Sequence, residues 1–397
     1  MKFGIFYEHQ LPKPWAEDSE YRLLHNSLEQ IELADRLGYD YAWEVEHHFL
    51  EEYSHSSAPE VFLSAASQRT KNIRLGHGIV QLTTNHPARV AERVSTLDLL
   101  SHGRVELGLG EGSSVTELHP FDRKFRDKRA VWEDGVRCLI PMFDSTHERG
   151  TEYHGEFFDF PLRNVVPKPR QKPHPPLWVA CSQMETIRMA GSRGMGALGF
   201  QFVSAAAAQA WVHAYYNAYT KRLDKLADYA TNPAIAVVSQ FMCAPTDEEA
   251  KQKAEGSSFF QFALGFYNSH GPVEPGTVNL WDEFQTYKET PKGQQAKLGG
   301  LIGSPRTIIE RLRRFEESHV DQVILLNQAG KNAHDDICSS LELFANEVMP
   351  EFHDREPEHQ EWKQSVLAGD IELEELDTEP FNVRSNQTPT KAPATAN

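Results

Sequence analysis

The residues with the clearest chemical potential stand together at the end of one predicted strand. Residues 39–49 begin as an apolar strand and end in a carboxylate and two imidazoles, Glu46, His47 and His48. An imidazole gains and loses a proton near neutral pH, and a neighbouring carboxylate can orient it. Ionisable groups at the carboxyl end of a barrel strand lie where such folds do their chemistry. The alternative is a capped strand end with solvent-exposed histidines.

The composition is typical of a globular protein. The chain has 397 residues, 40% apolar and 24% charged, enough for one large α/β domain or two smaller ones. Residues 1–7 predict a first strand, and their apolar run is too short for a signal peptide. The sequence contains no apolar run long enough to predict a membrane span. The four cysteines are widely spaced, which predicts neither a metal site nor a disulfide framework and favours the cytoplasm.

The charge balance is acidic throughout. The formal charge is −17, and residues 354–397 hold ten acidic and four basic residues, or −6 of that total. Nucleic-acid binding requires a basic surface, so the sequence argues against it.

Strand and helix signals alternate along the chain. Eight such β-then-α units predict a parallel sheet, and eight strands close a (β/α)8 barrel. The predicted strands are 2–8, 40–46, 74–82, 104–110, 177–181, 196–202, 234–243 and 320–327, and the predicted helices are 26–37, 59–69, 87–101, 126–143, 185–193, 206–226, 246–267 and 335–348.

Two insertions interrupt this pattern within a predicted barrel domain of residues 1–353. A tail follows the domain. Residues 151–176 predict a small hairpin and a proline-rich connector. Residues 269–300 are rich in Gly, Pro and polar side chains and predict either a lid or a floppy surface loop. The acidic tail, 354–397, predicts disorder.

Six motifs in order resemble the bacterial-luciferase-like flavin-dependent monooxygenases, over roughly residues 1–352. The motifs are Met-Lys-Phe-Gly at 1–4, Glu-His-His-Phe at 46–49, Asn-His-Pro at 85–87 with Leu-Asp-Leu-Leu-Ser-His-Gly-Arg at 97–104, Gly-Leu-Gly-Glu-Gly at 108–112, Gly-Ser-Pro at 303–305, and Glu-Val-Met-Pro at 347–350.

The resemblance implies a luciferase-like TIM barrel that binds reduced FMN, supplied by a separate flavin reductase. Dioxygen would form a peroxyflavin that oxygenates a small hydrophobic organic substrate in a dry pocket. It also implies a homodimer through the helices near 59–70 and 87–101. Two alternatives stay open: a deazaflavin-dependent hydride-transfer enzyme, and a flavin-binding subunit without catalysis.

The resemblance also assigns roles to residues at the barrel mouth. His47 aligns with the catalytic imidazole of the family, with a purely structural role as the alternative. His48 is expected to pack beside it, and Glu46 to orient an imidazole or cap the strand. His86 stands at the end of the third strand, either in the site or as a turn residue before Pro87.

Five positions align with flavin contacts on the third and fourth strands and the next helix. Gly78 and Ile79 align with a non-prolyl cis peptide against the flavin ring. Gly110 and Glu111 stand where bacterial luciferase has a cysteine and an arginine. The glycine would leave room for a bulkier substrate, and the carboxylate puts a phosphate contact in doubt. Arg129 aligns with a second phosphate-binding arginine, or is an ordinary surface residue.

The fifth strand and its helix offer a phosphate site. Cys181 and Ser182 precede the helix, whose first N–H groups suit phosphate, and Ser182 could instead serve only as the N-cap. Family members usually have a Ser or Thr hydroxyl at about the position of Glu185, and Thr186 would supply that hydroxyl here. No GxGxxG fingerprint for a nicotinamide cofactor is present.

Several aromatic residues are candidates for the substrate pocket or its lid, with ordinary core packing as the alternative. They are Phe121, Phe125, Phe200, Phe202 and Trp281.

Overall fold

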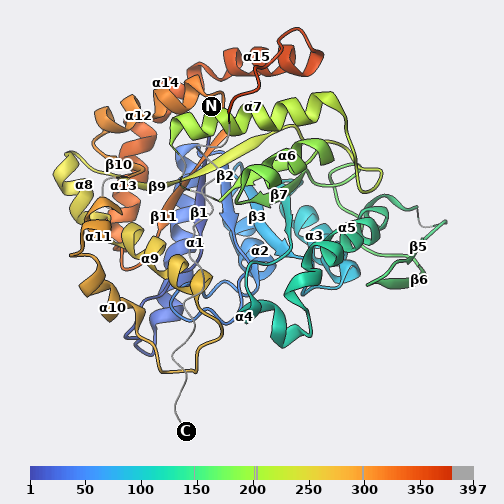
Figure 1. Ribbon diagram of the computed structural model, residues 1–397, viewed down its shortest axis with the longest axis horizontal. Helices are drawn as coiled ribbons and strands as arrows, with labels where there is room; N and C mark the ends of the chain where they lie inside the picture. Colours follow the sequence, from blue (N-terminus) through green and yellow to red (C-terminus); the bar gives the residue numbers. More distant parts are fainter. Residues whose placement is uncertain (147, 201, 203, 297–298, 378–397) are drawn as a thin grey trace.

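Eight parallel strands form a closed barrel in the computed structural model, which describes residues 1–146, 148–200, 202, 204–296 and 299–377 (Figure 1). The sheet order is β9-β11-β1-β2-β3-β4-β7-β8, and β8 pairs with β9 to close the circle. The predicted (β/α)8 barrel is therefore confirmed. The strands are β1 Lys2–Tyr7, β2 Tyr41–Glu44, β3 Arg74–Gln81, β4 Val105–Gly110, β7 Leu177–Cys181, β8 Gly196–Gly199, β9 Ile235–Cys243 and β11 Gln322–Gln328.

Helices surround the barrel, and most begin and end at recognisable signals. Pro59 and Pro87 occupy the first turns of their helices, and Gly38 ends α1 at φ +87°. The sequence did not predict the short strand β10 (Leu301–Gly303) and the helix after it, which Ser304 caps. The outer helices are α1 Ser19–Leu37, α2 Pro59–Arg69, α3 Pro87–Leu100, α5 Lys128–Asp144, α6 Met184–Arg193, α7 Ala205–Lys221, α8 Asp247–Lys253, α9 Glu255–Ser269, α12 Pro305–Glu317 and α13 His334–Glu347.

Two tryptophans fill the barrel interior. Trp43 and Trp178 are buried and meet edge to face with ring centroids 5.4 Å apart. A Cβ on Gly76 would lie 2.2 Å from the Trp43 ring, and one on Gly196 would lie 2.4 Å from the Trp178 ring. Glycine at these positions therefore makes room for the indoles, and the barrel is a packed core.

The insertion at 269–300 contains two short helices and is fixed to the barrel. It contains α10 (Leu280–Tyr287) and α11 (Pro291–Ala296), which pack beside α9. The buried Glu52 carboxylate accepts hydrogen bonds from the backbone N–H of Leu280, at 2.6 Å, and of Trp281, at 3.2 Å. The alternative of a floppy surface loop is therefore wrong for the described part of this insertion. The other insertion contains the predicted hairpin, β5 (Thr151–His154) with β6 (Asp159–Arg163).

The acidic tail begins with a helix, α15, so the predicted disorder from residue 354 is wrong for its first part. α14 (Met349–Asp354) and α15 (Glu356–Ala368) continue the chain, and α15 packs beside α7 (Figure 1). The buried Asp321 carboxylate accepts hydrogen bonds from Lys363 Nζ at 2.9 Å and pairs with His359 Nε2 at 3.0 Å. Trp362 stacks on His319 at 3.9 Å. Residues 378–397 lie outside the described residues.

The four cysteines are not joined to one another by disulfides. Among the described helices, none combines the length and apolar character needed to cross a membrane.

Replacing Trp362 tests the docking of α15. We expect Trp362→Ala to lower the free energy of unfolding by about 2 kcal/mol, because the half-buried ring loses its contacts with His319 and Tyr216. Urea denaturation would measure this, and limited proteolysis should show faster cleavage after residue 354. Gln364→Ala, on the exposed face of the same helix, is the matched control. Equal stability of the two variants would contradict the docking.

Candidate active site

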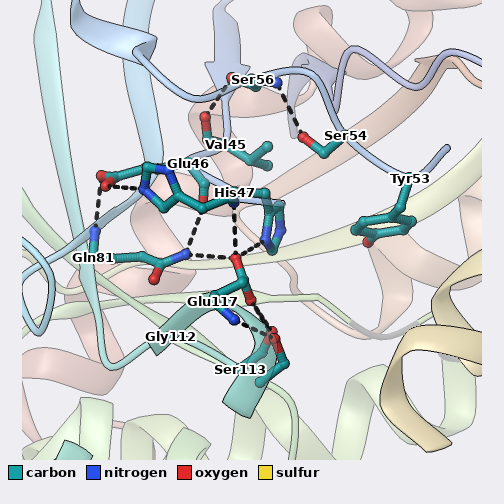
Figure 2. A network of polar contacts seen from close by, with 12 residues as sticks. Val45, Glu46, His47, Tyr53, Ser54, Ser56, Gln81, Gly112, Ser113 and Glu117 are labelled. Carbon is teal, nitrogen blue, oxygen red and sulfur yellow. Dashed lines mark hydrogen bonds and ion pairs between the residues drawn. The ribbon is translucent and has the colours of Figure 1, made fainter. Parts of the chain in front are cut away.

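His47 lies between the buried carboxylates of Glu117 and Glu8 at the carboxyl end of the barrel, and Figure 2 shows its contact with Glu117. Its Nδ1 is 2.8 Å from Glu117 Oε1, and its Nε2 is 3.5 Å from Glu8 Oε2. β2 ends at Glu44, two residues earlier than predicted, and the His47 N–H leaves the strand ladder to donate to the carbonyl of Ser56 at 2.8 Å. The imidazole keeps 19% of its surface exposed, so an incoming ligand can reach it.

Glu117, like Glu8, is a functional candidate that the sequence analysis missed. It lies on the short helix α4 (Val115–Leu118) after β4, and its side chain is fully buried. The carboxylate accepts hydrogen bonds from Gln81 Nε2 at 2.9 Å, Ser113 Oγ at 3.1 Å and Ser114 Oγ at 3.0 Å, as Figure 2 shows in part. The pattern of Ser114 followed by Glu117 reads as an ordinary helix start, which hides the role of the carboxylate.

The three groups shift one another's pKa values. Burial lowers the pKa of His47, but Glu117 and Glu8 outweigh it and raise this pKa to about 9. Burial favours a raised pKa for Glu117, yet His47, Gln81 and Ser114 lower it to about 2. Burial raises the pKa of Glu8 to about 7, against the opposing charge of His47. At neutral pH His47 is therefore an imidazolium, Glu117 is ionised and Glu8 is close to half protonated.

Glu46 holds the second imidazole. Its Oε1 pairs with His48 Nε2 at 3.0 Å and accepts a hydrogen bond from Asn85 Nδ2 at 2.7 Å, while Oε2 accepts from the Gln81 N–H at 3.0 Å. Gln81 donates from its side chain to both the Glu46 carbonyl and Glu117. The two histidines thus belong to one hydrogen-bonded network with separate carboxylate partners.

Aromatic rings form an apolar wall beside His47. Tyr53 meets the imidazole edge to face at 5.5 Å and donates its hydroxyl to Glu8 Oε1 at 2.9 Å. Its ring contacts Phe260 at 5.4 Å, and Phe260 contacts Phe202 at 5.8 Å. Such a wall keeps water away from the charged groups.

The other predicted aromatics divide between mouth and core. Phe121 is partly exposed and lies 5.1 Å from the His48 ring, and Phe125 is also exposed. Phe200 packs on Phe6 at 5.4 Å, and Trp281 packs on α9.

His86 is a helix cap on the surface. Its exposed ring accepts a hydrogen bond from the Ala88 N–H at 3.1 Å and lies against Phe158 at 5.8 Å. The described contacts of His86 do not include the His47 network, which matches the alternative of a structural turn residue.

The strand positions expected to face the flavin differ from expectation in two ways. The Gly78–Ile79 peptide is not among the cis bonds, which all precede prolines, so the expected cis peptide is wrong. β3 instead bulges between His77 and Val80. Gly110 leaves no open space either, because its Cβ would lie 2.5 Å from Ile79 Cδ1. The Ile79 side chain fills the room that a larger residue at 110 would need.

Glu111 and Arg129 form an ion pair across the segment after β4. Lys128 Nζ lies 3.6 Å from the other Glu111 oxygen. The Arg129 charge opposes the effect of burial on the pKa of the Cys181 thiol, which places the guanidinium near the end of β7. The Glu111 carboxylate therefore pairs with two cations at the start of α5.

The three residues predicted to bind phosphate near the start of α6 differ in exposure and in their hydrogen bonds. Ser182 is exposed, but the N-cap is Gln183, so the expectation of Ser182 as N-cap is wrong. Thr186 Oγ1 accepts from the Gln183 N–H at 3.2 Å in the capping box and donates to the Gln183 carbonyl at 2.8 Å. The Cys181 thiol is buried and donates to the Thr186 carbonyl at 3.3 Å, so it points into the protein and is not available to a cofactor.

Comparison with known proteins identifies the family. The family model described as luciferase-like monooxygenase matches residues 1–322. The chain belongs to the luciferase-like monooxygenases. It is 26% identical, over 89% of this chain and 96% of the relative, to the oxygenase component of a flavin-dependent trigonelline monooxygenase from Acinetobacter baylyi.

Solved structures share the fold of this luciferase-like monooxygenase. The oxygenating constituent of 3,6-diketocamphane monooxygenase from Pseudomonas putida, in complex with FMN, matches with a TM-score of 0.67, 19% identity and coverage of 88% of this chain and 98% of that chain. A coenzyme F420-dependent tetrahydromethanopterin reductase from Methanopyrus kandleri matches with a TM-score of 0.62, 19% identity and coverage of 88% and 99%. At these identities the likeness shows the fold alone.

Removing the charge of Glu117 tests the pairing with His47. We expect Glu117→Gln to lower the His47 pKa by roughly one to three units, because the amide removes an opposing charge within hydrogen-bond distance. NMR titration of the imidazole Cε1–H resonances would measure the change. Glu46→Gln, which alters the partner of His48, should shift the His47 pKa less. An unchanged His47 titration in Glu117→Gln would show that the pairing does not set its charge.

Proposed function

We propose that this luciferase-like monooxygenase is the oxygenase component of a two-component system that takes reduced FMN from a separate reductase. It would use dioxygen to oxygenate a small hydrophobic organic substrate. The observation that carries the proposal is the His47 imidazole held between the Glu117 and Glu8 carboxylates beside an aromatic wall. The oxygenase-component name of the Acinetobacter relative supports the separate reductase, and the FMN complex of a fold neighbour supports the cofactor.

The residues at the start of α6 fit the phosphate of FMN. Arg129, whose charge acts on Cys181 at the end of β7, would supply a cation to a phosphate held by the exposed Ser182 and the first N–H groups of α6. Lys128 precedes Arg129 at the start of α5 and would add a second cation. Both cations already contact Glu111, so a phosphate would compete with that carboxylate for them. The side chains of Cys181 and Thr186 are engaged elsewhere and would not contribute.

Bound reduced FMN would supply the electrons that activate dioxygen, and the protein would manage the protons. His47 is protonated at neutral pH and can donate from Nε2, since Nδ1 is held by Glu117. Glu8, with its pKa near 7, can exchange a proton with His47 Nε2 across 3.5 Å. Tyr53 orients Glu8 and, with Phe260, shields these groups from water.

The aromatic wall favours an apolar substrate. Tyr53, Phe202 and Phe260 form a continuous set of ring contacts next to His47. Rings of this kind contribute large apolar contact area and stack with planar substrates. A small hydrophobic molecule would lie against them within reach of the imidazole.

The fold leaves the choice of flavin to experiment. A deazaflavin enzyme on the same barrel would transfer hydride and leave dioxygen unused, and the F420-dependent structure has a similar TM-score. A subunit without catalysis would not need a buried imidazolium with two carboxylate partners, whose desolvation costs several kcal/mol.

The helices α2 and α3 are suited to a homodimer interface. They pack against each other and expose the apolar residues Val61, Leu99 and Leu100. Apolar side chains at such sites are buried when a second copy packs on them.

The pH dependence of flavin oxidation tests the role of His47. We expect the rate at which dioxygen oxidises enzyme-bound reduced FMN to fall as the pH rises through about 9, where His47 loses its proton. Stopped-flow absorbance should show that His47→Gln slows the reaction by roughly 10²-fold or more and removes this pH dependence.

His86→Asn is the matched control, because it changes an exposed histidine and keeps a helix-capping side chain. It should retain the wild-type pH profile. A profile shared by wild type and His47→Gln would refute the role of His47, and reduced FMN that binds without reacting with dioxygen would favour the deazaflavin enzyme.

A further inference from the structure

Residues 53–56 connect the backbone of Glu8 to that of His47. Ser54 Oγ donates to the Glu8 carbonyl at 2.7 Å and accepts from the Ser56 N–H at 3.2 Å, a bond that Figure 2 shows. The Ser56 carbonyl in turn accepts from the His47 N–H at 2.8 Å. Both serines are buried, so solvent does not compete for these bonds. Ser54 and Ser56 therefore form a bridge, the serine bridge, between the segments that follow β1 and β2.

A buried carboxylate anchors this bridge. The Ser56 hydroxyl lies within hydrogen-bond distance of the Val45 carbonyl, at 2.7 Å, and of Glu44 Oε1. Glu44 is 1% exposed, and the same oxygen lies 2.8 Å from His9 Nδ1. Because His9 directly follows Glu8, the Glu44 carboxylate contacts the serine bridge on one side and the chain beside Glu8 on the other.

His9 has a backbone conformation that histidine rarely adopts. Its φ is +49°, in the left-handed region, and the residue is fully buried. Its ring meets Phe62 of α2 edge to face at 4.5 Å, and its carbonyl accepts from the His55 N–H at 3.0 Å. Such a conformation persists only where the surroundings enforce it. The chain after Glu8 is therefore held in one conformation by Glu44, Phe62 and the segment that carries the serine bridge.

The bridge bears on the chemistry because Glu8 and His47 are at the limit of proton-exchange distance. Glu8 Oε2 lies 3.5 Å from His47 Nε2, whereas direct proton transfer requires about 2.6–3.2 Å between the heavy atoms. Tyr53, in the same segment as the serines, donates to Glu8 Oε1 at 2.9 Å. Residues 53–56 thus hold both the side chain and the backbone of Glu8, and a displacement of this segment would change its distance from His47.

We propose that Ser54 and Ser56 are positioning residues that hold Glu8 within proton-exchange distance of His47, with Glu44 as their anchor. This inference rests on the proposed function, in which Glu8 and His47 exchange a proton. The two serines contribute neutral hydroxyl and backbone groups, so their replacement would alter the geometry of the site and leave its charges in place.

The proton affinity of His47 reports the position of Glu8. Burial lowers the pKa of His47, and the charges of Glu117, Glu8 and Glu46 raise it to about 9. The neutral Tyr53 ring also faces the imidazole. Since the attraction between two charges weakens with distance, a shift of Glu8 away from the ring lowers this pKa even when the contact with Glu117 is kept.

Titration of His47 by NMR in the full-length protein without flavin tests the serine bridge. We expect the double variant Ser54→Ala/Ser56→Ala to lower the His47 pKa by roughly one unit, because Glu8 is free to move away. Each single variant should give a part of this shift, which keeps the test valid if the double variant does not fold. In stopped-flow oxidation of bound reduced FMN, the pH above which the rate falls should decrease by the same amount.

Two further variants separate positioning from general effects on the fold. Ser67→Ala is the matched control, because Ser67 is equally buried and its hydroxyl donates to the Ser64 carbonyl, outside the His47 network. It should leave the His47 pKa unchanged. Glu44→Gln keeps an acceptor for the Ser56 hydroxyl, so it should shift the His47 pKa less than Glu44→Ala does.

Two results would overturn the proposal. The first is a double variant that is folded by urea denaturation and titrates His47 at the wild-type pKa. The second is a Ser67→Ala variant that lowers this pKa as much as the double variant does. A lowered His47 pKa with an unchanged pH profile of flavin oxidation would support the positioning role and contradict the proposed role of His47, so the two failures are distinguishable.

Discussion

The chemistry at the mouth of this barrel depends on one interaction, the contact of a largely buried imidazolium with two carboxylates. Glu8 follows β1, His47 follows β2 and Glu117 follows β4, while Gln81 ends β3 and joins the network from between them. The strands β1, β2, β3 and β4 lie side by side in the sheet, in the order in which they occur in the chain. The fold thus brings together groups that lie up to 109 positions apart in the sequence, and their mutual charges keep the imidazole protonated at neutral pH.

Burying these charged groups costs free energy, and hydrogen bonds from the surrounding residues offset part of that cost. Glu8 Oε2 has no hydrogen-bond donor, and burial raises the Glu8 pKa to about 7. Glu117 offsets part of this cost, because Gln81, Ser113 and Ser114 satisfy its oxygens. Buried polar networks of this type are stable only when most members are paired, so the exception at Glu8 marks the point where proton exchange is expected.

Much of the barrel could be predicted because its signals are local. Apolar runs, a first-turn proline at Pro59 or Pro87 and a terminal Gly38 locate strands and helices without tertiary information. The helix α15 escaped prediction because its stability comes from Asp321 and His319, far along the chain, and not from its acidic composition. Helices α10 and α11 escaped for the same reason, since Glu52 fixes the start of α10 from a distant loop.

The site was predictable only in part. His47 stands out by residue type, whereas Glu117 looks like a helix-capping residue until the fold brings it to the imidazole. The space expected at Gly110 is filled by Ile79, and the Cys181 thiol turns inward, because side-chain direction depends on packing across strands that sequence does not reveal. The ion pair between Glu111 and Arg129 was also missed, because each residue was considered only as a possible contact of the phosphate and not as a partner of the other.

The most direct test of the account follows the histidine side-chain NMR resonances while reduced FMN is added without oxygen. The account predicts a saturable change in the His47 resonance, with little change at His359, which lies in α15, or at His319, which stacks on Trp362 of that helix. Saturable binding of reduced FMN that leaves His47 unperturbed would contradict the placement of the flavin site at this imidazole.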